Sequence, residues 1–224
     1  MLVATSFMAF GNSITEGKNA SGQVQNTYPV NLRVMLAARY TTQSISVINK
    51  GVGGERASQG ADRLPRELDL VHPEVLLLEE GVNDLSDEPH DISALIAALR
   101  VMVRQARNRS IAVFLGTLLP ARAGGTPPRG DGALPFIPEA NAQIRLLAQS
   151  ERVTLVDLYE GFGGSPDLYI DVDGLHPNEL GYQKIAQLYF DAIKTTLEIR
   201  QTPGVATEFV QNTPTPNLPF MRLR

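Results

Sequence analysis

Short, nearly continuous apolar runs alternate along this chain with longer segments in which apolar residues recur every three or four positions. The clearest runs are Val75–Leu78 and Ile111–Leu115. Runs of this kind are typical of strands that are covered on both faces, as in a parallel sheet. The expected strands are Val3–Phe10, Ser44–Asn49, Glu74–Glu79, Ile111–Leu118 and Val153–Leu158.

The segments between these runs have the period of amphipathic helices. The most regular helical segment follows Asp91, a plausible N-cap, and the last one follows Pro177. Weaker signals cover Pro29–Tyr40, Ala57–Val71 and Pro138–Ser150. This alternation predicts an α/β fold, a three-layer α/β/α sandwich around a five-stranded, parallel, doubly wound (flavodoxin-like) sheet.

Length and composition limit the classes of function. With 224 residues, 43% of them hydrophobic and 20% charged, we expect one globular domain over residues 1–200 and a Pro-rich tail over 201–224. The net charge of −4 and the scattered Lys and Arg argue against a nucleic-acid partner. The absence of cysteine excludes disulfides, a Cys nucleophile and zinc–thiolate sites. No apolar run reaches the ~20 residues of a membrane span, and Leu2–Phe10 has the pattern of a first strand rather than of a signal peptide.

In a doubly wound sheet the ligand crevice lies beyond the carboxyl ends of the strands, so functional residues should follow strands. The segment after the first strand contains Gly11, Ser13 and Gly17-Lys18. A phosphate loop is one interpretation, but five residues separate these glycines where that motif needs four, and Asn19 replaces its Ser or Thr. The other interpretation is a tight strand-to-helix turn that presents Ser13 at a helix N-terminus, where developing negative charge is favoured.

A serine nucleophile needs a base, and the chain has three histidines. His72 precedes a strand, at the wrong edge of the sheet, which indicates a surface or capping role. His90 lies in a loop after a strand, and we expect it to be solvated. His176 stands three residues after Asp173, whose carboxylate can accept the Nδ1 proton and fix the tautomer. A calcium loop at Asp171–Gly174 is disfavoured, because Leu175 stands where another oxygen ligand is needed. We therefore expect no metal and no cofactor.

Two further loops follow strands. Asn49–Glu55 and Gly81–Asp84 are rich in Gly and Asn, which can reflect turn chemistry alone. Both loops, however, should emerge on the same edge as Ser13. A Gly backbone N–H and an Asn side-chain amide can stabilise the oxyanion that forms during acyl transfer.

A longer loop, Pro120–Pro135, follows the fourth strand and carries four Gly and four Pro together with Arg122, Arg129 and Asp131. It can be a solvated connector or a flap that contacts the substrate, since long loops on this edge are often functional. The sequence leaves both interpretations open.

Together these segments resemble the SGNH hydrolases, the superfamily of GDSL-type esterases and lipases. The matching blocks are Phe10–Thr15, Asn49–Gly54, Gly81–Asp84 and Asp173–Pro177, and the likeness extends from residue 3 to about 195. The resemblance implies a metal-independent hydrolase of carboxylic esters that acts through an acyl-enzyme. Its substrate would be a small-molecule or carbohydrate ester.

The resemblance also implies a role for each matched residue. Ser13 would be the nucleophile, His176 the base and Asp173 its partner. The oxyanion hole would consist of the Ser13 N–H, the Gly54 N–H and the Asn83 side chain; Gly54 is preferred over Gly53 because it precedes the acidic Glu55.

One departure from the family pattern is Asn12, which replaces the usual Asp, and we expect activity to survive this change. A second oddity is Glu80, which can hydrogen-bond within the crevice or anchor the turn at Gly81, and we favour the anchor.

The alternatives are a lysophospholipase or thioesterase of the same fold, a non-catalytic carbohydrate-binding module, and a nucleotide-binding protein. The absence of a large apolar lid favours short acyl groups. The complete set of Ser, Gly, Asn, Asp and His favours an enzyme over a binding module.

Overall fold

A computed structural model describes residues 1–24, 26–163 and 166–199 of the chain. Its strands are β1 (Ser6–Gly11), β2 (Ser46–Gly51), β3 (Val75–Glu79), β4 (Ala112–Gly116) and β5 (Thr154–Val156). The helices are α1 (Ser13–Glu16), α2 (Tyr28–Arg39), α3 (Ala57–Val71), α4 (Val82–Ser86), α5 (Ile92–Arg107), α6 (Ile137–Glu151), α7 (Leu158–Gly161) and α8 (Glu179–Leu197), with a 3₁₀ turn at Pro166–Leu168.

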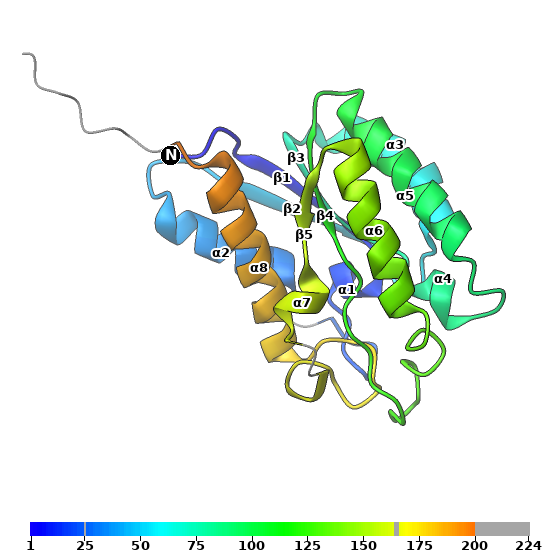
Figure 1. Ribbon diagram of the computed structural model, residues 1–224. Helices are drawn as coiled ribbons and strands as arrows, with labels where there is room; N and C mark the ends of the chain where they lie inside the picture. Colours follow the sequence, from blue (N-terminus) through cyan, green and yellow to red (C-terminus); the bar gives the residue numbers. More distant parts are fainter. Residues whose placement is uncertain (25, 164–165, 200–224) are drawn as a thin grey trace, which may run out of the picture.

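The strands form one parallel sheet in the order β2-β1-β3-β4-β5. Helices α2 and α8 cover one face, and α3, α5 and α6 cover the other (Figure 1). The predicted three-layer, flavodoxin-like sandwich is therefore confirmed. Gly11 lies in register with Gly51 and Glu79, so β1, β2 and β3 end at the same level. The segments that follow these strands consequently meet at one edge of the sheet.

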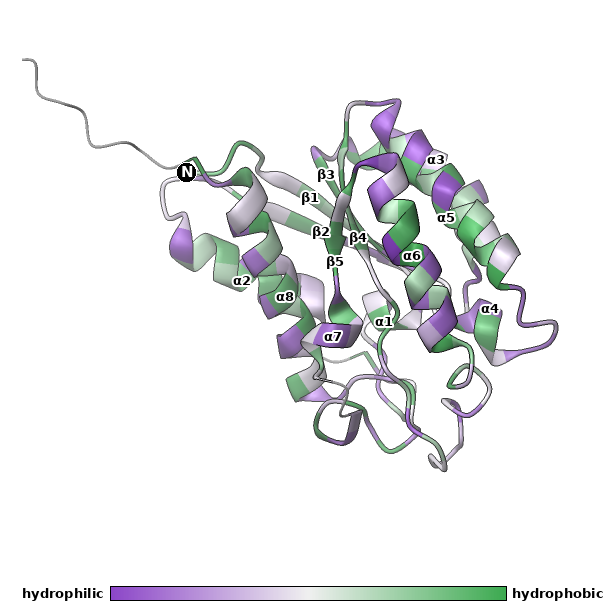
Figure 2. Ribbon diagram, viewed as in Figure 1, coloured by the Kyte–Doolittle hydropathy of each residue, from purple (hydrophilic) through white to green (hydrophobic). Residues whose placement is uncertain are grey.

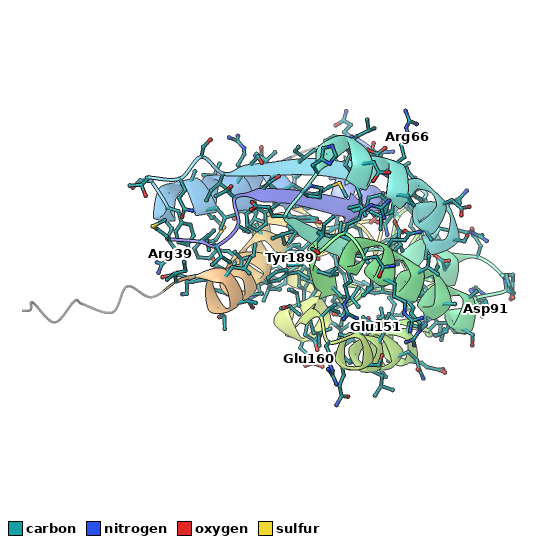
Figure 3. All side chains as sticks on the ribbon, turned by 90° about the horizontal axis from the view of Figure 1, so that it is seen from above. Arg39, Arg66, Asp91, Glu151, Glu160 and Tyr189 are labelled. Atoms are coloured by element: carbon teal, nitrogen blue, oxygen red, sulfur yellow. The ribbon has the colours of Figure 1, made fainter. Side chains whose placement is uncertain are left out.

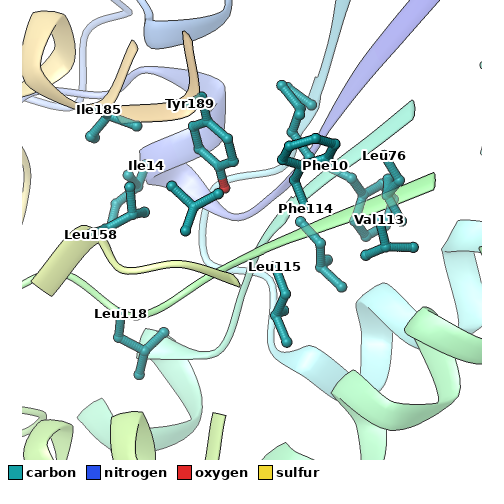
Figure 4. Packing of buried hydrophobic residues seen from close by; sticks show 14 of the residues in the cluster. Phe10, Ile14, Leu76, Val113, Phe114, Leu115, Leu118, Leu158, Ile185 and Tyr189 are labelled. Carbon is teal, nitrogen blue, oxygen red and sulfur yellow. The ribbon is translucent and has the colours of Figure 1, made fainter. Parts of the chain in front are cut away.

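The core runs through the sheet and into this edge. The central strand β3 is buried along its whole length, whereas the residues of the edge strand β2 are half-buried or exposed. Figure 2 shows hydrophobic and hydrophilic residues alternating along the long helices that cover the sheet, such as α5 and α6. Buried side chains from several elements meet around Tyr189 of α8, among them Ile14 and Leu158 (Figure 4). Ile14 directly follows Ser13, so the core anchors the turn that carries this serine.

Polar side chains fix the ends of the long helices. Asp91 Oδ1 accepts the Ala94 N–H at 2.9 Å, which confirms the predicted cap of α5. Asn178 accepts the Gly181 N–H at 3.0 Å and starts α8 directly after Pro177. Glu151, at the end of α6, binds three arginines of α5 (Figure 3), namely Arg100, Arg104 and Arg107.

Several strand boundaries differ from the prediction by two or three residues: β2 is shifted by two residues along the chain, β4 ends two residues early, and β1 and β5 differ for identifiable local reasons. The first strand begins at Ser6 rather than Val3, because Leu2 bridges to Glu198 and the Val3 N–H donates to the last turn of α8. The fifth strand ends at Val156, because Asp157 caps α7 by accepting the Glu160 N–H. Apolarity alone predicts both segments as strand, whereas these local contacts end the strands earlier.

The Pro-rich tail over 201–224 falls outside the described residues, so its assignment remains a prediction. Within the described ranges, the helices include none of the length and apolarity that a membrane crossing requires.

Candidate active site

The turn after β1 presents Ser13 at the carboxyl edge of the sheet. Asn12 Oδ1 accepts the Ile14 N–H at 2.9 Å and so caps the short helix α1, of which Ser13 is the first residue. Gly17 ends that helix with φ of 99°, a left-handed conformation that suits glycine. The Asn12 cap and the Gly17 stop thus define the short helix that presents Ser13.

Ser13, His176 and Asp173 lie in a continuous hydrogen-bonded chain. His176 Nε2 is 2.9 Å from Ser13 Oγ, and His176 Nδ1 is 2.6 Å from Asp173 Oδ2. Ser13 and His176 are each 5% exposed, and Asp173 is fully buried. Both distances fall within the range for proton transfer. The arrangement can therefore activate the hydroxyl as a nucleophile.

The Asp173 carboxylate is held by three N–H donors. Its Oδ1 accepts the backbone N–H groups of Leu175 and His176, each at 3.0 Å, and its Oδ2 accepts the imidazole proton. Burial alone would raise the pKa of Asp173, but the hydrogen bonds from His176 and Leu175 outweigh it and hold the pKa below its usual value. Asp173 is therefore a carboxylate at neutral pH.

The predicted oxyanion donors line the same cavity as Ser13. Gly54 has φ of 78°, and the Asn83 amide donates to the Glu55 carbonyl at 2.8 Å, which ties the two donor loops together. Neither the Ser13 N–H nor the Gly54 N–H has a hydrogen-bond acceptor among the described residues. Both N–H groups are therefore available to a ligand oxygen.

Beneath the serine turn lie two buried acids, Glu79 and Glu80. Glu80 Oε1 accepts the Gly81 N–H at 3.0 Å and the Asn12 amide at 3.2 Å, so Glu80 both anchors the Gly81 turn and bonds within the crevice. Desolvation raises the pKa of Glu79 to about 8. It also raises the pKa of Glu80, with further contributions from the charges of Glu79 and Glu55.

The cavity has a volume of about 490 Å³. Most of its lining is polar or glycine, and Leu175 and Pro128 are the main apolar contributors. Its lining residues are Ser13, Lys18, Gly22, Gly53, Gly54, Asn83, Ser86, Asp87, Pro128, Arg129, Gly132, Leu175 and His176. Sequence reasoning did not assign Lys18, Ser86, Asp87 or Leu175 to the site. It named Arg129 only as part of a loop of undecided role.

The other two histidines lie elsewhere. His72 ends α3 in a left-handed conformation, in agreement with the expected capping role. His90 differs from the expected solvated residue, because its ring stacks on Phe136 at 4.4 Å and its side chain is 17% exposed. The packed ring explains the difference, and His90 does not line the cavity. Across the described ranges, no cluster of three or more His, Cys, Asp or Glu is placed to hold a metal ion.

Known proteins resemble this chain in sequence and fold. The model of the GDSL-like lipase/acylhydrolase family matches residues 9–184. A multidomain esterase of Ruminococcus flavefaciens is 26% identical over 146 residues, which cover 65% of this chain and 18% of that protein. The chain thus spans less than a fifth of the length of that relative.

Solved structures show the same architecture. The lipase/acylhydrolase from Enterococcus faecalis superposes with a TM-score of 0.76 at 25% identity, covering 88% of this chain and all of that one. An acetylxylan esterase from Geobacillus stearothermophilus superposes with a TM-score of 0.72 at 20% identity, covering 86% of this chain and 96% of that one. At 20% identity, the likeness to the acetylxylan esterase shows a shared fold.

Proposed function

The chain belongs to the GDSL-like lipase/acylhydrolase family, within the SGNH hydrolases, and from this premise we propose that it hydrolyses short-chain acyl or acetyl esters through an acyl-enzyme on Ser13. The observation that carries the proposal is the 2.9 Å contact between Ser13 Oγ and His176 Nε2, beside free N–H donors in one cavity. A serine that merely capped a helix would need no buried imidazole aligned on its hydroxyl.

In the proposed acylation step, Ser13 Oγ attacks the ester carbonyl carbon while His176 Nε2 takes the hydroxyl proton. The carbonyl oxygen becomes an oxyanion that accepts hydrogen bonds from the Ser13 N–H, the Gly54 N–H and the Asn83 amide. Collapse of this intermediate breaks the bond to the alcohol oxygen, and His176 returns the proton to the departing alcohol. The Asp173 carboxylate stabilises the imidazolium throughout.

Deacylation repeats these steps with water. His176 removes a proton from a water molecule, the resulting hydroxide attacks the acyl carbon, and the bond to Ser13 Oγ breaks as the proton returns to it. The products are the free acid and the regenerated serine. No residue changes its redox state, and the net reaction consumes one water for each ester bond.

The lining of the cavity supports a short acyl group and a polar alcohol such as a carbohydrate. Leu175 and Pro128 provide too little apolar surface to bury a long acyl chain, since each buried methylene needs apolar contacts to contribute about 0.8 kcal/mol. Polar side chains and glycine backbone are instead available to hydroxyl groups.

The test is a panel of p-nitrophenyl esters from acetate to palmitate, together with acetylated xylo-oligosaccharides and an acyl thioester. We expect kcat/KM to be highest for acetate and to fall with chain length. Ser13→Ala should abolish turnover and His90→Ala should retain it. A maximum at long chains or thioesters would favour a lysophospholipase or thioesterase. Saccharide binding without turnover would indicate a binding module, and ATP binding a nucleotide-binding protein.

A further inference from the structure

The loop Pro120–Pro135 is docked on the turn that carries Asp173. The N–H groups of Arg122 and Thr126 donate to the carbonyls of Gly174 and Val172, each at 2.8 Å. The Arg129 N–H donates to the Asp173 carbonyl at 3.0 Å. The loop is therefore neither a free connector nor an open flap, because its backbone is bonded to the turn beside the active site.

Glycine makes this close approach possible. A Cβ atom at Gly125 would collide with the backbone of Asp173, and one at Gly130 would collide with the Gly174 carbonyl. Across the contact, Gly174 has φ of 78° and would itself collide with the Arg122 carbonyl if it carried a side chain. Side-chain-free backbone on both segments thus sets the distance between the loop and the turn.

This docking brings a cation to the Asp173 carboxylate. Arg129 Nε lies 3.8 Å from Asp173 Oδ2, the same oxygen that accepts the His176 Nδ1 proton. The Arg129 side chain is 52% exposed and lines the cavity, whereas Asp173 is fully buried. Because 3.8 Å exceeds hydrogen-bond distance, the guanidinium acts as a nearby charge and does not compete with His176 for the carboxylate.

Other charged or titratable groups surround the pair at greater remove. They are Asp171 in the same turn, Tyr182 of α8, Lys18 after α1 and Asp87 after α4. Arg122, the second arginine of the loop, is turned away, because its guanidinium donates to the Asp171 carbonyl. Among the described residues, Arg129 is the cation within 4 Å of the Asp173 carboxylate.

We propose that Arg129 is a positioning residue whose charge favours the Asp173 carboxylate, so that the Asp173–His176 pair acts as a base down to a lower pH than it would without Arg129. The inference rests on the proposed function, because it assigns a role within the same site. A fixed positive charge 3.8 Å from Asp173 Oδ2 favours the charged form of this carboxylate, which in turn orients His176 towards Ser13. The loop therefore acts on the chemistry through charge as well as through backbone contacts.

The test compares Arg129→Gln with Arg129→Lys, and with Arg66→Gln as a control that removes an equal charge from the exposed surface of α3 (Figure 3). The backbone N–H that docks the loop is retained in both Arg129 variants. For p-nitrophenyl acetate, Arg129→Gln should move the acid limb of kcat/KM to higher pH by roughly 0.5 unit, a value discounted for solvent screening. Arg129→Lys and Arg66→Gln should keep the wild-type profile. High salt should reduce the distance in pH between the acid limbs of Arg129→Gln and wild type, because it screens the charge of Arg129.

A second readout does not depend on turnover. The rate at which a fluorophosphonate labels Ser13 should shift along the pH axis in Arg129→Gln in the same direction as kcat/KM. If no ester is hydrolysed yet this shift occurs, the proposed function fails and the role of Arg129 stands. Unchanged profiles in both measurements would overturn the inference. A change confined to KM for anionic esters would do so as well, because it would make Arg129 a substrate contact.

Discussion

Buried acids lie on two sides of the Ser13–His176 contact, and their surroundings differ. Asp173, on the histidine side, has three N–H donors and a guanidinium nearby, and its pKa is lowered. Glu79, on the serine side, is equally buried, but neither of its carboxyl oxygens has a hydrogen-bond partner among the described residues, and its pKa is raised to about 8.

Burial alone therefore does not decide the direction in which the pKa of an acid shifts in this site; at Asp173 the hydrogen bonds outweigh burial, whereas at Glu79 and Glu80 burial prevails. The histidine side supplies a fixed negative charge. On the serine side, burial raises the pKa of Glu79 and Glu80, and Glu80 supports the turn by accepting the Gly81 N–H and the Asn12 amide. The surroundings thus shift the pKa of a carboxyl group in opposite directions on the two sides of the site.

The largest effect should follow from removing the charge on the histidine side. Asp173→Asn keeps the size of the side chain but turns an amide towards His176 Nδ1 and favours the wrong tautomer. We expect kcat on p-nitrophenyl acetate to fall by roughly 10³–10⁴. Asp171→Asn, two residues away in the same turn, is the matched control and should lose less than about tenfold. Activity of Asp173→Asn near the control level would contradict a functional carboxylate.

On the serine side, the turn that Glu80 anchors carries a donor rather than a charge. Asn83→Ala removes one proposed hydrogen bond to the oxyanion, and kcat should fall by roughly 10²–10³ with little change in KM. Steady-state kinetics on the acetate ester measures the effect, and circular dichroism checks the fold. A rise in KM alone would instead assign Asn83 to ground-state binding.

The contrast between Asp173 and Glu79 can be tested through the pH dependence of the free energy of unfolding. Its pKa is about 8 in the folded protein against an ordinary value of 4.5. Between these values the unfolded chain releases the proton while the folded chain keeps it, so the free energy of unfolding falls as the pH rises. Glu79→Gln removes this loss, and its advantage over wild type should grow from about zero near pH 4.5 to a few kcal/mol near pH 8. Urea unfolding of both proteins across this pH range measures the difference in stability. A difference that does not change with pH would show that Glu79 is ionised in the folded protein.

The smallest effect should come from Asn12→Asp. The new carboxylate cannot donate to Glu80 Oε1, which lies 3.2 Å from the Asn12 amide, but a protonated Glu80 can donate to it instead. The two acids would then share one proton, so activity should survive at neutral pH and decline earlier on the alkaline side. The pH profile of kcat measures the change. Loss of activity at every pH would show that the Asn12 amide itself is required.

Much of this site could be predicted because its residues obey a local rule. Ser13, Gly54 and Asn83 each follow a strand closely, and parallel strands end at one edge. His176 lies 163 residues from Ser13, yet its place at the mouth of the last helix indicates the same edge. The contact between Ser13 and His176 therefore follows from the topology once the alternation of strands and helices is recognised.

The contacts that were missed have no such local signal. Arg129 lies in a loop that has no periodic pattern of apolar residues. Its approach to Asp173 depends on the glycines at the contact between the loop and the turn, and nothing in the sequence links these glycines to that turn. The bond between Asn12 and Glu80 joins the residues that directly follow β1 and β3, and it depends on side-chain directions that no local pattern of the sequence records. The predicted first strand starts too early for a similar reason. Most residues before β1 are apolar, but Leu2 forms an isolated bridge with Glu198, after α8, and this long-range contact has no local signal in the sequence.

The most direct measurement is covalent labelling with a fluorophosphonate, followed by intact-mass and fragment analysis. We predict one adduct per chain, located on Ser13, with protection by an acetyl ester substrate and no adduct in folded Ser13→Ala. An adduct on another residue, or ester hydrolysis that persists in Ser13→Ala, would contradict the assignment of Ser13 as the nucleophile.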